Sequence, residues 1–323
     1  MLLPDLAGAR ALVTGASGFI GANLTRALLA MDAEVHALVR TEGVLDVLPA
    51  DAAVHRADLR EPGALARAVV SARPDVVFHL AAGPGHPVDA AGRAAMVQDT
   101  VVGTANLLEA LRGLRPRLVH VGGALEYGHG RRPLRETDTP APVTFRGAAK
   151  CAATLLALEH AHATGTPVTV LRPFAVYGPW ERPPRFVPAV VQAALRGEPI
   201  PVTAGGEGRD YVFVGDVVDA CLLAATSPRA VGEVFNVGTG RLTMNEELVG
   251  RLAAVSGYEL DVRLGAHEPR PWDAGMWVAD PTKAAEVLGW RPAHDLDAGL
   301  AETVAWFAER EAPVAGAGRG RPT

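Results

Sequence analysis

Lysine is almost absent from this chain of 323 residues. Only Lys150 and Lys283 are lysines among its 31 basic residues, and isoleucine is equally rare, with Ile20 and Ile200 alone. Alanine, valine, arginine and glycine take their places, which indicates a coding bias toward GC-rich codons and not a demand of the fold. Under such a bias, a lysine that is retained is more often one that the protein needs as lysine.

Cysteine, a basic excess and long apolar runs are also lacking. The two cysteines, Cys151 and Cys221, stand in no CxxC or Cys/His spacing, so neither a disulfide framework nor a metal site is expected. The net charge of −5 argues against a nucleic-acid binder. No uncharged apolar run reaches the roughly 18 residues of a membrane span, and the start, with Pro4 and Asp5, lacks the basic segment of a signal peptide. We therefore expect a cytoplasmic protein with no metal, nucleic-acid or membrane partner.

Apolar runs alternate with helical patterns through the first half of the chain. Continuous β-branched runs without polar alternation suit strands buried on both faces, and strand–helix alternation favours βαβ units with a parallel sheet. The predicted strands are Arg10–Thr14, Glu34–Val39, Asp75–Leu80, Arg117–Val121 and Val168–Arg172, and the predicted helices are Ala22–Met31, Pro62–Ser71, Met96–Arg112 and Ala148–Thr164.

The alternation of apolar runs and helical patterns ends near residue 175. Four prolines interrupt it there: Pro179, Pro183, Pro184 and Pro188. We predict an α/β protein with a dinucleotide-binding domain over about 1–175 and a smaller C-terminal α/β substrate lobe over 176–311. Some segments of that lobe are expected to return to the first sheet. Residues 312–323 are rich in Gly, Ala, Pro and Arg, and we expect a disordered tail there.

A glycine-rich turn follows the first predicted strand and opens the first helix. Its sequence, Thr14–Gly21 (TGASGFIG), spaces three glycines as Gly-x-x-Gly-x-x-Gly. Such a turn lets the backbone approach a pyrophosphate, and the helix start supplies free N–H groups for the phosphates. A Rossmann-type doubly wound sheet that binds a dinucleotide is therefore predicted. The predicted contacts of this turn are Gly15, Ser17, Gly18, Phe19, Ile20 and Gly21.

Four further segments resemble those of the extended short-chain dehydrogenase/reductase family, whose members include sugar-nucleotide epimerases, dehydratases and reductases. They are Asp58-Leu59, His79-Leu80-Ala81-Ala82, Arg172–Pro179 (RPFAVYGP, with Ala175 where Asn is usual) and Tyr211–Asp219 (YVFVGDVVD). The resemblance covers nearly the whole chain. It implies cofactor contacts from Asp58, Leu59, Leu80, Ala81, Ala82, Lys150 and Pro173.

The form of the nicotinamide cofactor depends on the end of the second strand. An NAD enzyme usually places an acid there for the ribose 2′-hydroxyl, whereas this strand ends in Val39-Arg40. Arg40 can pair with a 2′-phosphate, which favours NADP(H) over NAD(H). The alternative is an arginine that only faces solvent.

The resemblance also implies substrate contacts. In relatives, arginines in segments like Gly205–Asp210 and Arg270–Asp273 hold the diphosphate of a sugar nucleotide, which guanidinium forks bind well. The predicted substrate-binding residues are Tyr177, Arg209, Arg270 and Asp273. The alternative is a pair of surface arginines in loops.

The catalytic residues of the family are only partly present. Its members use a tyrosine, a lysine four residues later and a serine or threonine; here Lys150 is kept, while Arg146 and Gly123 occupy the other two positions. Arginine stays protonated, so Arg146 is not a base but could stabilise developing negative charge. Glu126, Tyr127 and Tyr177 are the other candidates for proton transfer.

These residues leave three functions open. The leading one is NAD(P)(H)-dependent modification of a nucleotide-diphosphate sugar, by 4-keto reduction or epimerase/dehydratase-type chemistry. The segment Gly122–Gly128 (GGALEYG) resembles 4-keto reductases and favours reduction weakly. The alternatives are a non-catalytic protein that binds the cofactor and sugar nucleotide, or a non-redox lyase or isomerase with a structural cofactor. By family analogy we expect a homodimer through helices Met96–Arg112 and Ala148–Thr164.

Overall fold

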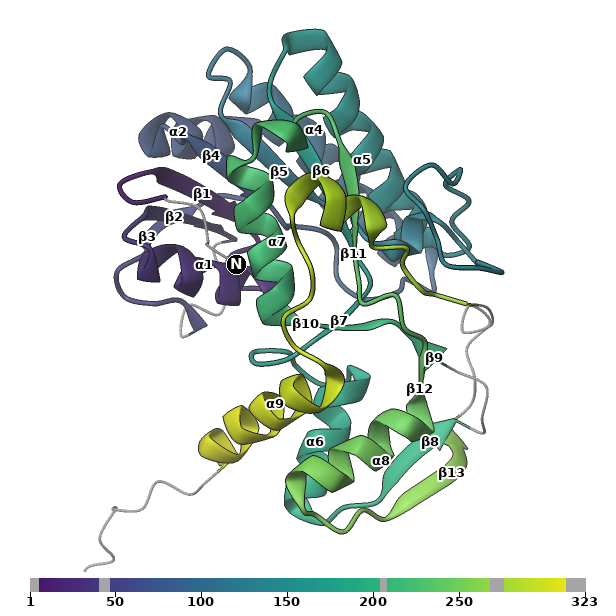
Figure 1. The fold of residues 1–323 in the computed structure, drawn as a ribbon. Coiled ribbons are helices and arrows are strands. Elements are labelled where there is room, and N and C mark those ends of the chain that lie inside the picture. Colours follow the sequence, from purple (N-terminus) through teal and green to yellow (C-terminus); the bar gives the residue numbers. More distant parts are fainter. Residues whose placement is uncertain (1–5, 41–46, 204–207, 268–275, 312–323) are drawn as a thin grey trace, which may run out of the picture.

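A seven-stranded sheet forms the centre of the protein. The computed structural model describes residues 6–40, 47–203, 208–267 and 276–311. The strand order is β11-β6-β5-β4-β1-β2-β3, and each neighbouring pair is parallel (Figure 1). The strands are β1 (Arg10–Thr14), β2 (Glu34–Val39), β3 (Ala53–Arg56), β4 (Val76–His79), β5 (Arg117–Val121), β6 (Val168–Pro173) and β11 (Val234–Val237). The predicted Rossmann-type doubly wound fold is confirmed.

Helices cover both faces of this sheet, which explains the uninterrupted apolar strands. Leu24 of α1 (Phe19–Ala30) shares a buried core with Val13 of β1, and α7 (Val214–Thr226) packs on the same face beside α1 (Figure 1). On the other face, Leu12 and Val77 meet α2 (Pro62–Ala72), α4 (Gly103–Leu111) and α5 (Phe145–Thr164). Successive strand side chains point to opposite faces, so an apolar residue is needed at every position.

The helix predicted over Met96–Arg112 is longer and has three parts. It begins as α3 (Ala90–Val97), passes through a π-helical turn at Gln98–Val102 and continues as α4. In the turn, Thr100 is buried and its hydroxyl accepts a hydrogen bond of 2.9 Å from the amide of Gly83, just beyond β4. The turn therefore ties the helix to the edge of the sheet where the predicted cofactor residues lie.

The C-terminal elements form a smaller α/β lobe below the sheet (Figure 1). Its strands β8 (Ile200–Thr203) and β13 (Val262–His267) pair in parallel. Its helices are α6 (Phe186–Arg196), α8 (Asn245–Ser256) and α9 (Leu296–Glu311). Two short pairs connect the lobe with the sheet: β7 (Ala175–Tyr177) with β10 (Tyr211–Phe213), and β9 (Gly208–Arg209) with β12 (Thr243–Met244). Among the helices over these described ranges, none is long and apolar enough to cross a membrane.

Candidate functional site

The glycine-rich turn connects β1 to α1 where the strand order reverses. Gly15 has φ +69°, and a Cβ there would lie 2.9 Å from the amide nitrogen of Ala81. A Cβ on Gly21 would lie 2.2 Å from the carbonyl oxygen of Gly15, so no larger residue fits. Gly18 caps α1 without any side-chain hydrogen bond from the described residues. The first amides of the helix are therefore available to an anion, and the turn fits the diphosphate of a dinucleotide.

A histidine at the end of β4 contacts the start of this turn. His79 is buried, and its Nδ1 and Nε2 lie 2.7 Å and 2.9 Å from the hydroxyl oxygens of Thr14 and Thr104. Burial, helped by the positive charge of Lys150, lowers the pKa of His79 to about 3, so its ring is neutral. The structure places Leu80, Ala81 and Ala82, the predicted cofactor residues, directly after this anchored histidine.

Two arginines and two aspartates lie beyond the ends of β2 and β3. Arg60 Nη2 lies 2.6 Å from Asp58 Oδ2, and its Nε lies 3.6 Å from Asp99 Oδ1. Arg40 Nη1 lies 3.4 Å from the other oxygen of Asp99. The hydrogen bond from Arg60 is the main reason that the pKa of Asp58 is lowered, so this carboxylate is ionised. Leu59 is buried beside them. The carboxylates of this group can accept hydrogen bonds from hydroxyl or amino groups, and its guanidinium groups can bind a phosphate.

Lys150 reaches the carboxyl end of β5 from the second turn of α5. Its Nζ donates hydrogen bonds of 3.1 Å and 3.0 Å to the carbonyl oxygens of Val121 and Gly122. Burial, helped by the nearby positive charge of Arg146, lowers the pKa of Lys150 to about 8. This lysine can therefore both hold and release a proton near neutral pH.

Gly123 leaves open space beside Lys150. A Cβ at this position would meet only the carbonyl oxygen of Pro173 at 3.7 Å and Lys150 Cδ at 3.9 Å, which are ordinary contacts. Its φ of 166° is extended backbone that any residue adopts. The glycine is thus not required by the fold, and the missing serine or threonine hydroxyl is a chemical difference.

Arg146 lies in the first turn of α5, one turn before Lys150. Its Nη1 donates hydrogen bonds of 3.0 Å to the carbonyl oxygens of both Gly83 and Gly85. Burial lowers the pKa of Arg146, and the positive charge of Arg185 lowers it further. The side chain therefore spans from α5 to the loop after β4, at the edge of the sheet that carries the glycine-rich turn.

Glu126 and Tyr127 belong to a buried polar network. Arg172 Nε donates a 2.9 Å hydrogen bond to Glu126 Oε2, and its guanidinium carbon lies 4.5 Å from the centre of the Tyr127 ring. The Tyr127 hydroxyl donates to Asn236 Oδ1 at 2.8 Å. Burial raises the pKa of Tyr127 to about 12. Among the sequence-predicted catalytic residues, these two have partners in the interior, whereas Lys150 and Arg146 lie together at the sheet edge.

The predicted substrate residues are spread over the lobe. Tyr177 is buried, and its hydroxyl donates to the carbonyl oxygen of Leu296 at 3.4 Å. Arg209 lies in β9, where its Nη1 donates to the carbonyl oxygen of Gly208 at 2.8 Å. Arg270 and Asp273 lie outside the described residues, and so does most of the Gly205–Gly208 segment.

Asp210, which follows Arg209, is a functional candidate that the sequence motif offered without a role. Its buried carboxylate accepts hydrogen bonds from the amides of Thr239, Gly240 and Ala279. It therefore fixes the loop after β11 to the strand that carries Arg209.

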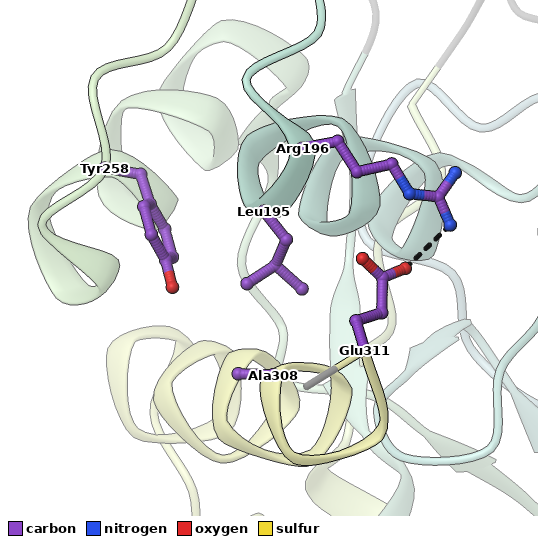
Figure 2. Close-up of a pocket in the computed structure, with 5 residues that line it drawn as sticks. All are labelled: Leu195, Arg196, Tyr258, Ala308 and Glu311. Carbon is purple, nitrogen blue, oxygen red and sulfur yellow. Dashed lines mark hydrogen bonds and ion pairs between the residues drawn. The ribbon is translucent and has the colours of Figure 1, made fainter. Parts of the chain in front are cut away.

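A separate hollow of about 520 Å³ lies in the C-terminal lobe between α6 and α9 (Figure 2). It is lined by Leu195, Arg196, Tyr258, Ala308 and Glu311, with a 2.8 Å ion pair between Arg196 and Glu311. None of these residues belongs to the predicted site. In the part of the chain that the structure describes, no cluster of His, Cys, Asp and Glu is arranged for a metal ion.

Comparison with known proteins identifies the family. The family model of the NAD dependent epimerase/dehydratase family matches residues 11–238. The chain belongs to this NAD-dependent epimerase/dehydratase family. A dTDP-glucose 4,6-dehydratase of Xanthomonas campestris is 30% identical to it, with 94% of this chain and 95% of that protein covered. A UDP-glucose 4-epimerase of Mycolicibacterium smegmatis is 35% identical, over 92% of this chain and 98% of the relative.

A solved structure shows the same similarity. The UDP-glucose 4-epimerase of Thermus thermophilus in complex with NAD superposes with a TM-score of 0.85 at 32% identity, and covers 94% of this chain and 99% of its own. The predicted membership among sugar-nucleotide epimerases and dehydratases is thus confirmed, as is the prediction of an enzyme of this type. The assignment of Lys150, Arg146 and Gly123 to the catalytic positions of the family stays a prediction.

Proposed function

We propose that the chain is an NAD(P)(H)-dependent enzyme acting on a nucleotide-diphosphate sugar, by 4-keto reduction or epimerase/dehydratase-type chemistry, in which Lys150 moves the proton. Two observations carry this proposal: the intact glycine-rich turn, and Lys150 of α5 with its amino group at the end of β5. When bound, the cofactor would accept a hydride from the sugar or donate one to it. Gly15, Gly18 and Gly21 would hold its diphosphate, and Asp58 and Leu59 its adenine.

Lys150 has the hydrogen-bond geometry of a proton carrier. A neutral amine has two N–H bonds and one lone pair, and the two carbonyl oxygens of Val121 and Gly122 accept both hydrogens. The lone pair then accepts the proton of a sugar hydroxyl when that carbon is oxidised. In the reverse direction, the third N–H of the ammonium donates its proton to a ketone oxygen.

The charges around Lys150 set the pH range of this step. Arg146 is the cation on its own helix, and His79 and His120 face it from β4 and β5. Both histidines are buried and have lowered pKa values, so they stay neutral. Glu126, the facing carboxylate, raises the pKa of Lys150 but is bonded to Arg172. A pKa of about 8 follows mainly from burial.

We propose NADP(H) as the preferred cofactor. The side chain of Arg40 is 56% exposed at the end of β2, and Arg60 lies within reach of the same aspartate. Two guanidinium groups at this corner suit a 2′-phosphate. On the substrate side, Arg209, Arg270 and Asp273 would hold the nucleotide diphosphate, and Tyr177 would shape the pocket by packing.

We also propose that the enzyme is a homodimer through α4 and α5. Leu155 of α5 is 58% exposed although α5 packs on α4 along the sheet. A second copy of the same pair of helices would cover it, which is the self-complementary arrangement of a two-fold dimer.

A second candidate function is a binding protein that has lost its chemistry, and Gly123 and Arg146 are the observations that favour it. The deciding experiment incubates the protein with UDP-glucose, dTDP-glucose and their 4-keto derivatives, each with oxidised and reduced NAD and NADP. Products are identified by mass spectrometry and nuclear magnetic resonance, with Lys150→Arg as the matched control. Turnover by the wild type that the control lacks supports the proposal, and binding without turnover in every combination favours the second candidate.

A further inference from the structure

Three cations, Lys150, Arg146 and Arg185, act on one another at the proposed reacting end of the site. Arg146 lowers the pKa of Lys150, and Arg185, at the start of α6, lowers the pKa of Arg146. Each positive charge thus repels its neighbour and disfavours that neighbour's protonated form. Two carboxylates that adjoin Lys150 and Arg185 are already paired, since Glu126 binds Arg172 and Glu181 binds Arg185. Over the residues that the structure describes, Arg146 has no carboxylate partner. An anion bound here would relieve this repulsion.

The guanidinium of Arg146 is held with one edge unused. Its Nη1 has two hydrogens, and the carbonyl oxygens of Gly83 and Gly85 accept both. Hydrogen bonds from Nε and Nη2 to other described residues are absent. These two nitrogens form the fork that binds a carboxylate with two parallel hydrogen bonds. Because the carbonyl oxygens already fix the side chain, little conformational freedom is lost on binding.

Arg146 lies near both groups that the proposed reaction uses. Gly83 follows Ala81, whose amide nitrogen would touch a Cβ on Gly15 of the cofactor turn. On the other side, Lys150 lies one helical turn after Arg146 on α5. Arg146 therefore connects the loop that adjoins the glycine-rich turn with the helix of the proposed proton carrier.

We propose that the sugar of the substrate carries a carboxylate, and that Arg146 binds it through Nε and Nη2 with Arg185 as a second cation from the opposite lobe. This inference rests on the proposed function, which supplies the sugar nucleotide. It gives a reason for arginine at this position: a neutral hexose would leave the charge of Arg146 uncompensated, and a sugar acid would not.

The test measures binding and does not depend on turnover. Cofactor-loaded protein is titrated by calorimetry with UDP-glucuronic acid and UDP-glucose, and then with the same pair of dTDP sugars, so that the base is not assumed. The wild type is expected to bind the sugar acid roughly 10- to 100-fold more tightly than the neutral sugar, the value of charge-assisted hydrogen bonds. Arg146→Gln should abolish this preference, and Arg146→Lys, which keeps the charge without the fork, should keep part of it.

Arg263→Gln is the matched control, because Arg263 is an exposed arginine of β13 that pairs with the neighbouring Asp261 at 2.9 Å. It should leave the preference unchanged. Unaltered cofactor affinity shows that each variant is folded. Equal affinities for acid and neutral sugar in the wild type, or a preference that survives Arg146→Gln, would overturn the inference and leave the proposed function standing. If neither sugar pair nor free UDP and dTDP bind while the cofactor does, the proposed function is wrong, and the inference falls with it.

Discussion

Turnover is expected to depend on the protonation of Lys150. Neutral Lys150 accepts a proton during sugar oxidation, so the rate of oxidation at saturating substrate should rise as the pH rises through about 8. Protonated Lys150 donates during ketone reduction, so the rate of reduction should fall over the same range. Lys150→Arg keeps the charge but replaces the amine by a guanidinium that stays protonated at ordinary pH, and it should lower either rate by about 100- to 10,000-fold.

Arg146→Gln separates the two causes of the lowered pKa of Lys150. Burial is the larger cause and stays in the variant, whereas the repulsion from Arg146 is removed. The midpoint of the pH profile should therefore move from about 8 toward the ordinary 10.5 without reaching it. The assay follows nicotinamide absorbance at saturating substrate between mildly acidic and alkaline pH. A flat profile through pH 8, or a Lys150→Arg variant as active as the wild type, would refute Lys150 as the proton carrier.

Four further outcomes are expected. Gly123→Ser combined with Arg146→Tyr should fold, because the new Cβ at 123 meets nothing closer than 3.7 Å, and should turn over more slowly than the wild type. Activity found only in this double variant would instead mark a protein that has lost its chemistry. Arg172→Met leaves a buried carboxylate unpaired and should lower the free energy of unfolding in urea by about 3–5 kcal/mol. Arg40→Asp should weaken binding of NADP relative to NAD by about tenfold in equilibrium titrations; an unchanged ratio would contradict NADP preference. Leu155→Glu should convert a dimer into a monomer in size-exclusion chromatography with light scattering, whereas a wild type that is already monomeric would contradict the dimer.

The buried strands were predictable from sequence because both of their faces are covered. The predicted ranges Arg10–Thr14, Glu34–Val39 and Arg117–Val121 agree with β1, β2 and β5 residue for residue. The edge strand β3 (Ala53–Arg56) was not predicted. It is four residues long, and only two of them, Ala53 and Val54, are apolar, so no apolar run marks it. Pairing with β2 defines the strand.

The cofactor turn was also readable from sequence, since its glycines are required by local backbone geometry. The environment of Glu126 could not be predicted from sequence, because its partner Arg172 lies 46 residues away in the chain. Likewise, the sequence identified Lys150 by its motif, but its burial and its two carbonyl acceptors depend on how α5 packs against the end of β5. Pairings between distant segments are set by tertiary structure, which residue spacing does not encode.

Transfer of hydrogen from sugar to cofactor tests the central claim most directly. The protein would be incubated with UDP-glucose, UDP-glucuronic acid and their dTDP counterparts, each deuterated at C4, together with NADP or NAD. The extracted cofactor would then be analysed by mass spectrometry. The account predicts deuterium on the nicotinamide with the wild type and its loss with Lys150→Arg. Sugar nucleotide bound at saturation with no deuterium on the cofactor would contradict it.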